Sequence, residues 1–350
     1  MRRQRGFTLL ELSVATAISG IVTVGVLALL RGQISGYDRQ QRVQDAQTSV
    51  RGAMDQLMRA VVPAGFGIPG EYLLGSATAN NRPSIGPAPE YICPGTDVIE
   101  IRSREPVGFF KAASATSTSI SVREPLTGEA DIVPITSHMK IVNGQLFFVF
   151  ASAGRYGLVS TTTNLAAMTA TATLALTSNS ESANLATFAM SVGDMVPVRS
   201  TRFFVSCNPA TNAKPYLFMA EGFDSDSDGV VEINPVAENI EDLQFAYLLD
   251  ADADGILNAS ELAAPVHAPT AAQYPTVKAI RITLVGRSSQ QLYNEAGGSV
   301  TVSQQPILED HDPGRPADRY SRRILQQTIL LENRNTTQPT NYNHFSSRYL

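Results

Sequence analysis

Twelve residues, 250–261, have the residue types and the spacing of a calcium-binding loop. Such a loop places carboxylates at its first, third and fifth positions, a glycine at the sixth, a backbone carbonyl at the seventh and a bidentate acid at the twelfth. The matching residues, with the side chain at the ninth position included, are Asp250, Asp252, Asp254, Gly255, Ile256, Asn258 and Glu261. Clustered carboxylates repel one another until a cation arrives. The segment predicts a structural Ca2+ site, and the alternative is an acidic Asp-Gly turn on a hairpin.

A second acidic segment begins in the same way at Asp224. Its acids are Asp224, Asp226, Asp228 and Glu232. Its twelfth position is Pro235, which has no side-chain oxygen, so a ligand would have to come from elsewhere. A solvated turn explains this segment better than a second calcium site does.

Other chemistry finds little support in the sequence. The four histidines are far apart and have neither metal-ligand nor triad spacing: His138, His267, His311 and His344. No Gly-rich phosphate loop and no nucleophile elbow is present. The net charge is −5, and no basic patch stands out, which argues against nucleic-acid binding. The sequence therefore predicts a protein that is not an enzyme.

The most distinctive element is an apolar segment near the N-terminus. No charged residue occurs from Leu12 to Leu30, which is 19 positions. A helix over residues 7–30 would be roughly 36 Å long, enough to cross a hydrocarbon core of about 30 Å. Arg2, Arg3 and Arg5 precede it and predict a cytoplasmic N-terminus. Glu11 lies near the beginning of this expected helix, just before the uncharged stretch, as an unpaired acid that should seek a cation.

The apolar segment continues into an amphipathic one over residues 31–62. Its apolar residues recur at spacings of three and four: Val43, Ala46, Val50, Met54, Leu57 and Val61. Its polar residues are Arg39, Arg42, Asp45, Arg51, Asp55 and Arg59. No proline occurs from Phe7 to Val62, and Pro63 ends the pattern. We therefore expect one continuous helix whose second half packs under a globular domain.

Residues 63–334 predict a β-rich globular domain, and 335–350 a polar tail. Residues 63–96 are dense in Pro and Gly and predict a long loop. Strand-like runs follow at 97–103, 132–135, 139–142, 145–150, 201–206, 216–219, 240–249, 277–285 and 320–331. Asn143-Gly144 predicts a hairpin between its flanking runs, whereas the Ser/Thr/Ala-rich segment 160–189 fits either short strands or a surface insertion. The fold class is α+β, an antiparallel sheet over the long helix.

The run from Arg5 to Leu12, Arg-Gly-Phe-Thr-Leu-Leu-Glu-Leu, resembles the class III signal of type IV prepilins and pseudopilins. The resemblance implies that a prepilin peptidase cleaves after Gly6, leaving a leader of residues 1–6, and methylates Phe7. It also implies that Glu11 pairs with the terminal amine of a neighbouring subunit. A buried carboxylate and a buried ammonium are each costly alone and tolerable together.

Three later segments resemble minor pilins of the PilW type: 239–247, 277–284 and 319–324. The resemblance implies a subunit at or near the filament tip that helps to initiate pilus assembly. Its implied partners are other minor pilins, the major pilin, the peptidase, the membrane and a tip adhesin. Two alternatives remain, namely a J-type pseudopilin of type II secretion and a membrane-anchored, calcium-dependent adhesin. Tyr320, Arg322 and Arg323 form either a contact patch or a solvated strand face.

The predicted topology places the chain in the bacterial inner membrane with its bulk in the periplasm, and then in a pilus on the cell surface. Cys93 and Cys207 both fall in the exported part. An oxidising compartment favours a disulfide between them, and the alternative is two buried thiols. The disulfide would close a loop of roughly 115 residues, which is worth about 4–5 kcal/mol in the chain-entropy model.

Overall fold

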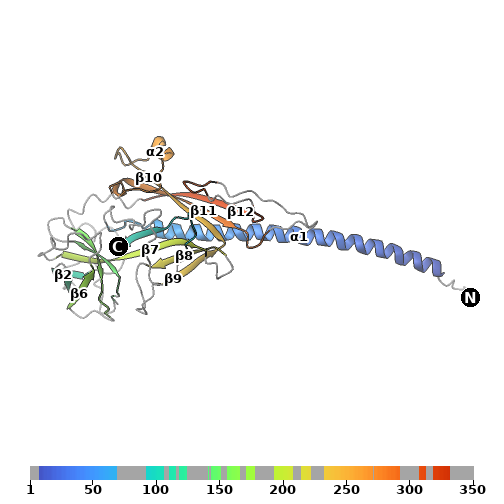
Figure 1. Ribbon diagram of the computed structural model, residues 1–350, viewed down its shortest axis with the longest axis horizontal. Coiled ribbons are helices and arrows are strands. Elements are labelled where there is room, and N and C mark those ends of the chain that lie inside the picture. Colours follow the sequence, from blue (N-terminus) through green and yellow to red (C-terminus); the bar gives the residue numbers. More distant parts are fainter. Residues whose placement is uncertain are drawn as a thin grey trace, which may run out of the picture.

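The computed structural model shows one long helix that extends from a β-rich body (Figure 1). The structure describes residues 8–68, 92–105, 110–115, 118–123, 141, 143–150, 156–165, 171–177, 193–207, 214–221, 232–270, 272–291, 307–312 and 318–331. This arrangement confirms the predicted α+β class.

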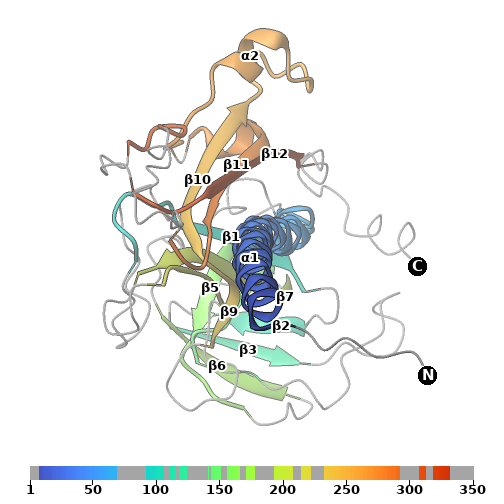
Figure 2. The same cartoon turned by 90° about the vertical axis from the view of Figure 1, so that its right-hand side faces the viewer.

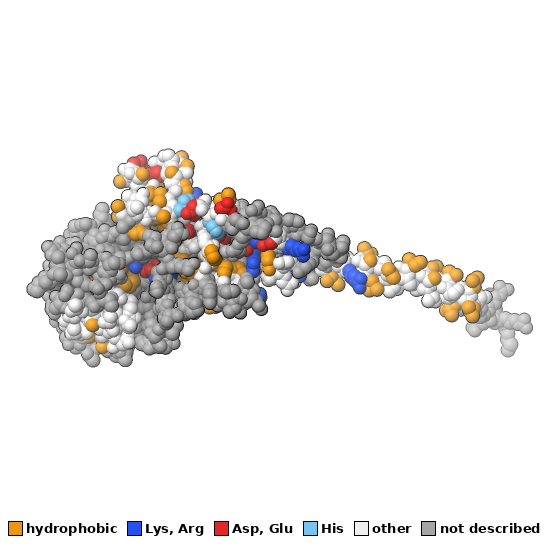
Figure 3. Space-filling view, in the orientation of Figure 1, with side chains coloured by type: hydrophobic (Ala, Val, Ile, Leu, Met, Phe, Trp, Pro, Cys, Tyr) orange, Lys and Arg blue, Asp and Glu red, His pale blue; other side chains and the backbone are white. Residues whose placement is uncertain are grey.

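The helix α1 spans Leu9–Val61 without a break, as predicted from the absence of proline. It begins two residues later than the expected start at Phe7, because Thr8 is its N-cap. Its first part, Leu9–Ile34, is long and apolar enough to cross a membrane, and none of it is buried. In Figure 3 apolar side chains cover this free half of α1.

The second half of α1 packs against the body through the predicted stripe. The buried residues are Ala46, Val50, Met54, Leu57 and Val61, together with Ala53. Val43 is half-buried, and the predicted polar residues Asp45, Arg51, Asp55 and Arg59 are exposed. The helical period therefore identified the packed face correctly.

Strands make up most of the other residues that the structure describes. They are β1 (Ile99–Arg104), β2 (Phe110–Ala115), β3 (Ser119–Arg123), β4 (Leu146–Phe150), β5 (Tyr156–Thr161), β6 (Thr171–Thr177), β7 (Gly193–Ser206), β8 (Tyr216–Glu221), β9 (Ile233–Glu238), β10 (Ile240–Leu249), β11 (Val277–Arg287) and β12 (Arg322–Leu330). A short helix α2 (Ala259–Ala263) and a 3-10 turn η5 (Tyr274–Thr276) lie between β10 and β11.

The packed half of α1 lies between two antiparallel sheets (Figure 2). One has the order β10-β11-β12, and the other includes β7, β8 and β9. Their shared core includes Leu57 of α1, Phe203 of β7 and Ile282 of β11. Gly286 in β11 allows the closest approach, because a Cβ there would collide with the side chain of Val50. We call this region, with α1, β1, β8–β12 and residues 201–206 of β7, the helix-proximal lobe.

The larger sheet also closes on itself. Its order β2-β3-β6-β5-β4-β7 is completed by a pairing of β2 with β7, so six strands form a ring. The ring encloses a second core: Phe110, Ile120, Val122, Ile141, Phe147, Val149, Val159, Leu174 and Met195. We call β2–β6 with residues 193–198 of β7 the ring lobe. It lies at the end of the molecule opposite the N-terminus (Figure 1).

Two sequence expectations need correction. The sequence predicted one sheet, and the structure has two, with the ring as an addition. The hairpin predicted at Asn143-Gly144 is wrong, because β4 pairs with β5 on one side and β7 on the other. Ile141 instead forms a bridge with Leu165. Within the segment 160–189, residues 171–177 are the strand β6, while 178–189 lie outside the described residues.

Candidate functional site

The N-terminal end of α1 is closed by a capping box between Thr8 and Glu11. The Glu11 backbone N–H donates to Thr8 Oγ1 at 3.3 Å, and the Thr8 backbone N–H donates to Glu11 Oε2 at 2.9 Å. The Thr8 hydroxyl donates to the same Oε2 at 3.0 Å. The Thr-x-x-Glu spacing is the usual signature of such a box, so the sequence contained this signal although the sequence analysis did not use it.

The capping box determines which carboxylate oxygen of Glu11 is available for further contacts. All three of its contacts with Thr8 leave Glu11 Oε1 without a hydrogen-bond partner among residues 8–68 and the rest of the described chain. Glu11 is exposed on the free half of α1. Gly6 and Phe7, the predicted processing residues, lie outside the described residues.

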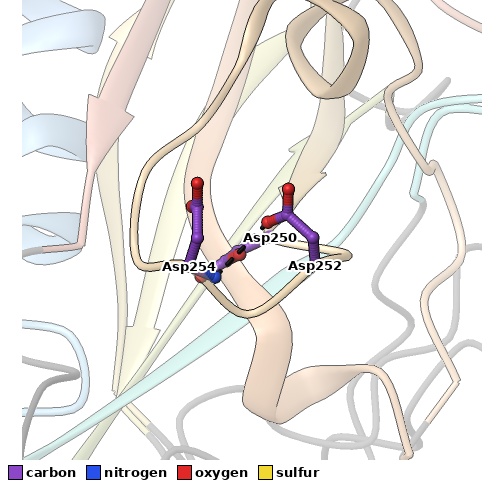
Figure 4. Close-up of side chains that lie close together, drawn as sticks. All are labelled: Asp250, Asp252 and Asp254. Carbon is purple, nitrogen blue, oxygen red and sulfur yellow. Dashed lines mark hydrogen bonds between the residues drawn. The ribbon is translucent and has the colours of Figure 1, made fainter.

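The predicted calcium loop connects β10 to α2. The structure brings together Asp250, Asp252 and Asp254, each with one carboxylate oxygen within 4.8 Å of the others (Figure 4). Asp250 is 3% exposed, whereas Asp252 and Asp254 are exposed. As expected, the element that enters the loop is a strand and not a helix.

The later residues of the motif lie outside this cluster and close the loop. Asn258 is the N-cap of α2, and its Oδ1 accepts from the backbone N–H groups of Ser260 and Glu261, at 3.0 Å each. Glu261 Oε1 accepts from Ala251 N at 2.7 Å, and Oε2 accepts from Asn258 N at 2.9 Å. Glu261 therefore ties the beginning of the loop to the beginning of α2.

The loop concentrates negative charge at the surface. The Asp254 backbone N–H favours the ionised form of Asp252, but partial desolvation and the charges of Asp254 and Glu261 outweigh it, so the pKa of Asp252 is raised. Ile256, expected to offer its carbonyl, has a side chain that is 68% exposed, and its N–H donates to Asp254 Oδ1 at 2.7 Å. The electrostatic environment of the loop is therefore negative.

The weaker acidic segment is only partly visible. Asp224, Asp226 and Asp228 lie outside the described residues, and Glu232 is half-buried just before β9. The prediction of calcium there stays untested.

The predicted disulfide is confirmed. Cys93 and Cys207 are bonded across a sequence separation of 114, with their Cα atoms 5.0 Å apart. The bond joins the turn before β1 to the end of β7, inside the core of the helix-proximal lobe. It thus holds the lobe that packs on α1.

Tertiary structure also creates an acidic cluster, partly buried, that the sequence did not predict. His311 Nδ1 lies 2.7 Å from Asp242 Oδ2, although the two residues are 69 positions apart. Nearby, burial raises the pKa of Asp97 to about 7, with help from the charges of Asp310 and Asp242 and against the hydrogen bond from the Phe245 N–H. Sequence spacing holds no signal for a cluster that three distant segments form.

The predicted contact patch at the start of β12 is mainly structural. Arg322 donates to Glu241 Oε2 at 2.6 Å and to Asp318 Oδ1 at 2.7 Å, and its side chain is 7% exposed. The guanidinium of Arg287 lies over the Tyr320 ring, 4.3 Å from its centroid. Arg323 is exposed. Arg322 and Tyr320 are therefore held inside the lobe.

Comparison with known families gives two matches. The family described as type IV pilus-assembly protein W matches residues 202–333, and the prokaryotic N-terminal methylation motif matches residues 1–27. The chain is a type IV pilus minor pilin of the PilW type. As a minor pilin it is a structural subunit that assembles with other pilus components and is anchored in the membrane by its apolar helix. Comparison with curated proteins gives no match.

Among solved structures, this minor pilin is similar to the type IV-like pilin TTHA1219 from Thermus thermophilus. The identity is 16% and the TM-score 0.24, with 55% of this chain and 84% of that chain covered. The PilW match extends from the end of β7 to just after β12. It therefore covers the sheet β10-β11-β12 together with β8, β9 and the end of β7, whereas β1 and the ring lobe lie outside it.

Proposed function

We propose that this minor pilin lies at or near the filament tip and helps to initiate pilus assembly with other minor pilins. Its further partners are the major pilin, which it meets through α1, the prepilin peptidase, and a tip adhesin. The proposed role is structural and needs no catalysis. The observation that supports it best is the continuity of α1, whose packed half is rigidly joined to an apolar half that the body leaves uncovered.

An apolar helix surface of this length has to be covered in each state of the protein. Before assembly the membrane covers it, with the N-terminus in the cytoplasm and the body in the periplasm. In the filament the helices of neighbouring subunits cover it. Apolar helices associate in this setting through close packing and polar contacts between helices.

Glu11 supplies the specific contact in this proposal. After cleavage behind Gly6, Phe7 has a new terminal amine, and Glu11 of one subunit meets the amine of its neighbour. Thr8 occupies Glu11 Oε2, which leaves Oε1 for the incoming cation. Pairing removes the cost of two separate buried charges.

The shape of the body supports a position at the tip. The ring lobe lies beyond the sheets that pack on α1, at the end farthest from the N-terminus (Figure 1). A subunit that is larger at this end fits where no further subunit is stacked above it. Inside the shaft, every subunit would need room for the same addition.

The processing step is tested by intact-mass analysis of the protein from cells with and without the prepilin peptidase. We expect the mature chain to lack residues 1–6 and to carry one additional methyl group only when the peptidase is present. An unprocessed chain in peptidase-positive cells would contradict the proposal and support the alternative of a solitary anchored adhesin.

The position is tested by immunogold labelling of an epitope in the ring lobe on sheared pili. We expect label at filament ends, and loss of both label and incorporation in Glu11→Ala. Label spread along the shaft would contradict a tip position. Cross-linking to components of a type II secretion system, with none to pilins, would support the pseudopilin alternative.

A further inference from the structure

We propose that the loop between β10 and α2 is a Ca2+ site in which Asp250, Asp252 and Asp254 supply the carboxylate ligands. The sequence pattern predicts this site but leaves an acidic turn as the alternative. The structure adds an independent observation, namely a buried carboxylate oxygen that has no hydrogen-bond partner among the described residues.

That oxygen belongs to Asp250. The side chain is 4% exposed, and Oδ1 has no hydrogen-bond partner among the residues that the structure describes. Oδ2 accepts from the Gly255 backbone N–H at 3.0 Å and lies 3.5 Å from Lys278 Nζ. A buried, unsatisfied carboxylate oxygen is costly, because it has lost its water without a replacement. One carboxylate oxygen of each of Asp250, Asp252 and Asp254 lies within 4.8 Å of the others, so a cation shared by the three would satisfy Asp250.

The charge balance of the loop also calls for a cation. Asp250, Asp252 and Asp254 bring three carboxylates together with the charge of Glu261 nearby, and the ammonium of Lys278 lies 3.5 Å from Asp250 Oδ2. A divalent ion would offset most of the remaining repulsion. Carboxylate oxygens at the surface without octahedral placement suit Ca2+ better than Mg2+, which demands near-ideal octahedral geometry and retains its waters.

The backbone of the loop is already shaped for this role. Gly255 has a φ of 87°, a conformation that side chains disfavour, and its N–H is thereby directed at Asp250. Glu261 acts as a positioning residue, because its two oxygens hold the backbone at Ala251 and at Asn258. Calcium would therefore fix the projecting segment that contains α2, which extends away from the rest of the body (Figure 2).

The test uses the full mature chain, purified in detergent and stripped with a chelator. CaCl2 is titrated by calorimetry, and thermal unfolding is followed with and without calcium. We expect saturable binding and a higher Tm with Ca2+, and binding of Mg2+ that is weaker by about tenfold or more. Absence of calcium binding up to about 10 mM, above the range of extracellular calcium modules, would overturn the proposal.

Single substitutions then assign the binding to this loop. We expect Asp250→Asn to weaken binding by about 30-fold or more, and Asp252→Asn and Asp254→Asn by about tenfold each. The exposed pair keeps the test valid if the buried variant fails to fold. The matched control is Asp55→Asn, the same change at an exposed acid on α1, which should leave binding unchanged. Binding that survives all three loop substitutions would overturn the assignment.

Discussion

The two lobes of this minor pilin are built around different cores. In the helix-proximal lobe, the strands bury their apolar faces against α1, and a disulfide lies in the same core. In the ring lobe, six strands close on themselves and bury Phe147, Val159 and Leu174 without any helix. The PilW match begins at residue 202, just after the part of β7 that belongs to the ring lobe. We therefore expect assembly to depend on the first lobe, whereas the second lobe is an addition with its own core.

One strand joins the lobes. β7 pairs with β2 and β4 in its first half and with β1 and β8 in its second half. Because β7 contributes to both cores, it fixes the position of one lobe relative to the other. Substitutions confined to one core should show whether assembly of the filament requires a correctly folded ring lobe.

The largest effect is expected from loss of the disulfide. Cys93→Ser with Cys207→Ser should lower the free energy of unfolding by about 4–5 kcal/mol, since a long loop is released in the unfolded chain. Denaturant unfolding of the full chain in detergent measures this. Hydrogen exchange should show protection falling first in β10–β12. Equal loss of protection in the ring would mean that the two lobes unfold as one unit.

A matched pair of core substitutions compares the lobes directly. Leu57 on α1 and Leu174 in the ring are both 0% exposed. Leu57→Ala and Leu174→Ala should each cost about 3 kcal/mol, because each leaves a cavity in a packed core. Only Leu57→Ala should reduce the amount of the protein in sheared pili on immunoblots. If Leu174→Ala reduces it equally, the ring lobe is required for assembly.

The contact between α1 and β11 is tested at two glycines. Gly286→Ala should destabilise the chain by about 2 kcal/mol, because the new methyl group would collide with Val50 and push the helix from the sheet. Gly52→Ala is the control, since nothing lies within 4 Å of a Cβ there, and it should stabilise α1 by about 0.5–1 kcal/mol. Thermal unfolding measures both variants. Equal stability of the two would show that the close approach at Gly286 is relaxed in solution.

The smallest effect is a dependence on pH within the helix-proximal lobe. Burial raises the pKa of Asp97 from 3.8 to about 7, so its contribution to stability is complete below pH 3.8 and is lost as the pH rises toward 7. Asp97→Asn should therefore raise the stability at pH 8 by about 1–2 kcal/mol relative to the wild type, with little gain at pH 4. Denaturant unfolding at the two pH values measures the difference.

Glu100 on β1 is the control for this pH dependence, because its pKa is shifted in the opposite direction from that of Asp97. Burial alone would raise its pKa, but Arg102 and Arg202 lower it to about 2, so its contribution is present above pH 4.5 and is lost as the pH falls toward 2. Glu100→Gln should destabilise the chain at pH 7 and not at pH 2. A wild-type stability that is flat from pH 4 to pH 8 would contradict the role of Asp97.

Several elements could be predicted because their signals are local. The helical period identified the packed residues of α1, and the absence of proline predicted its continuity. The run Ile240–Leu249 was predicted with the observed bounds of β10. The disulfide followed from two cysteines in an exported segment. The acidic spacing of the β10–α2 loop indicated its three clustered aspartates.

The predictions that failed concern residues whose structure depends on pairing with distant strands or side chains. Asn143-Gly144 has the local signature of a hairpin, but both edges of β4 are taken by distant strands. Nothing in the sequence signals that β2 and β7 pair to close a ring. Arg322 was expected at the surface, because its buried partner Glu241 lies 81 positions away.

By itself, the sequence determined the membrane-spanning helix, the processing signal, the amphipathic face and the spacing of the acidic loop. These features depend on the period and order of neighbouring residues, which can be read directly from the sequence. Only the tertiary structure decided the second core, the buried Asp242 and half-buried Asp97, and the unsatisfied oxygen of Asp250. Burial and strand pairing arise between residues that are far apart in the sequence, so they exist only once the chain has folded.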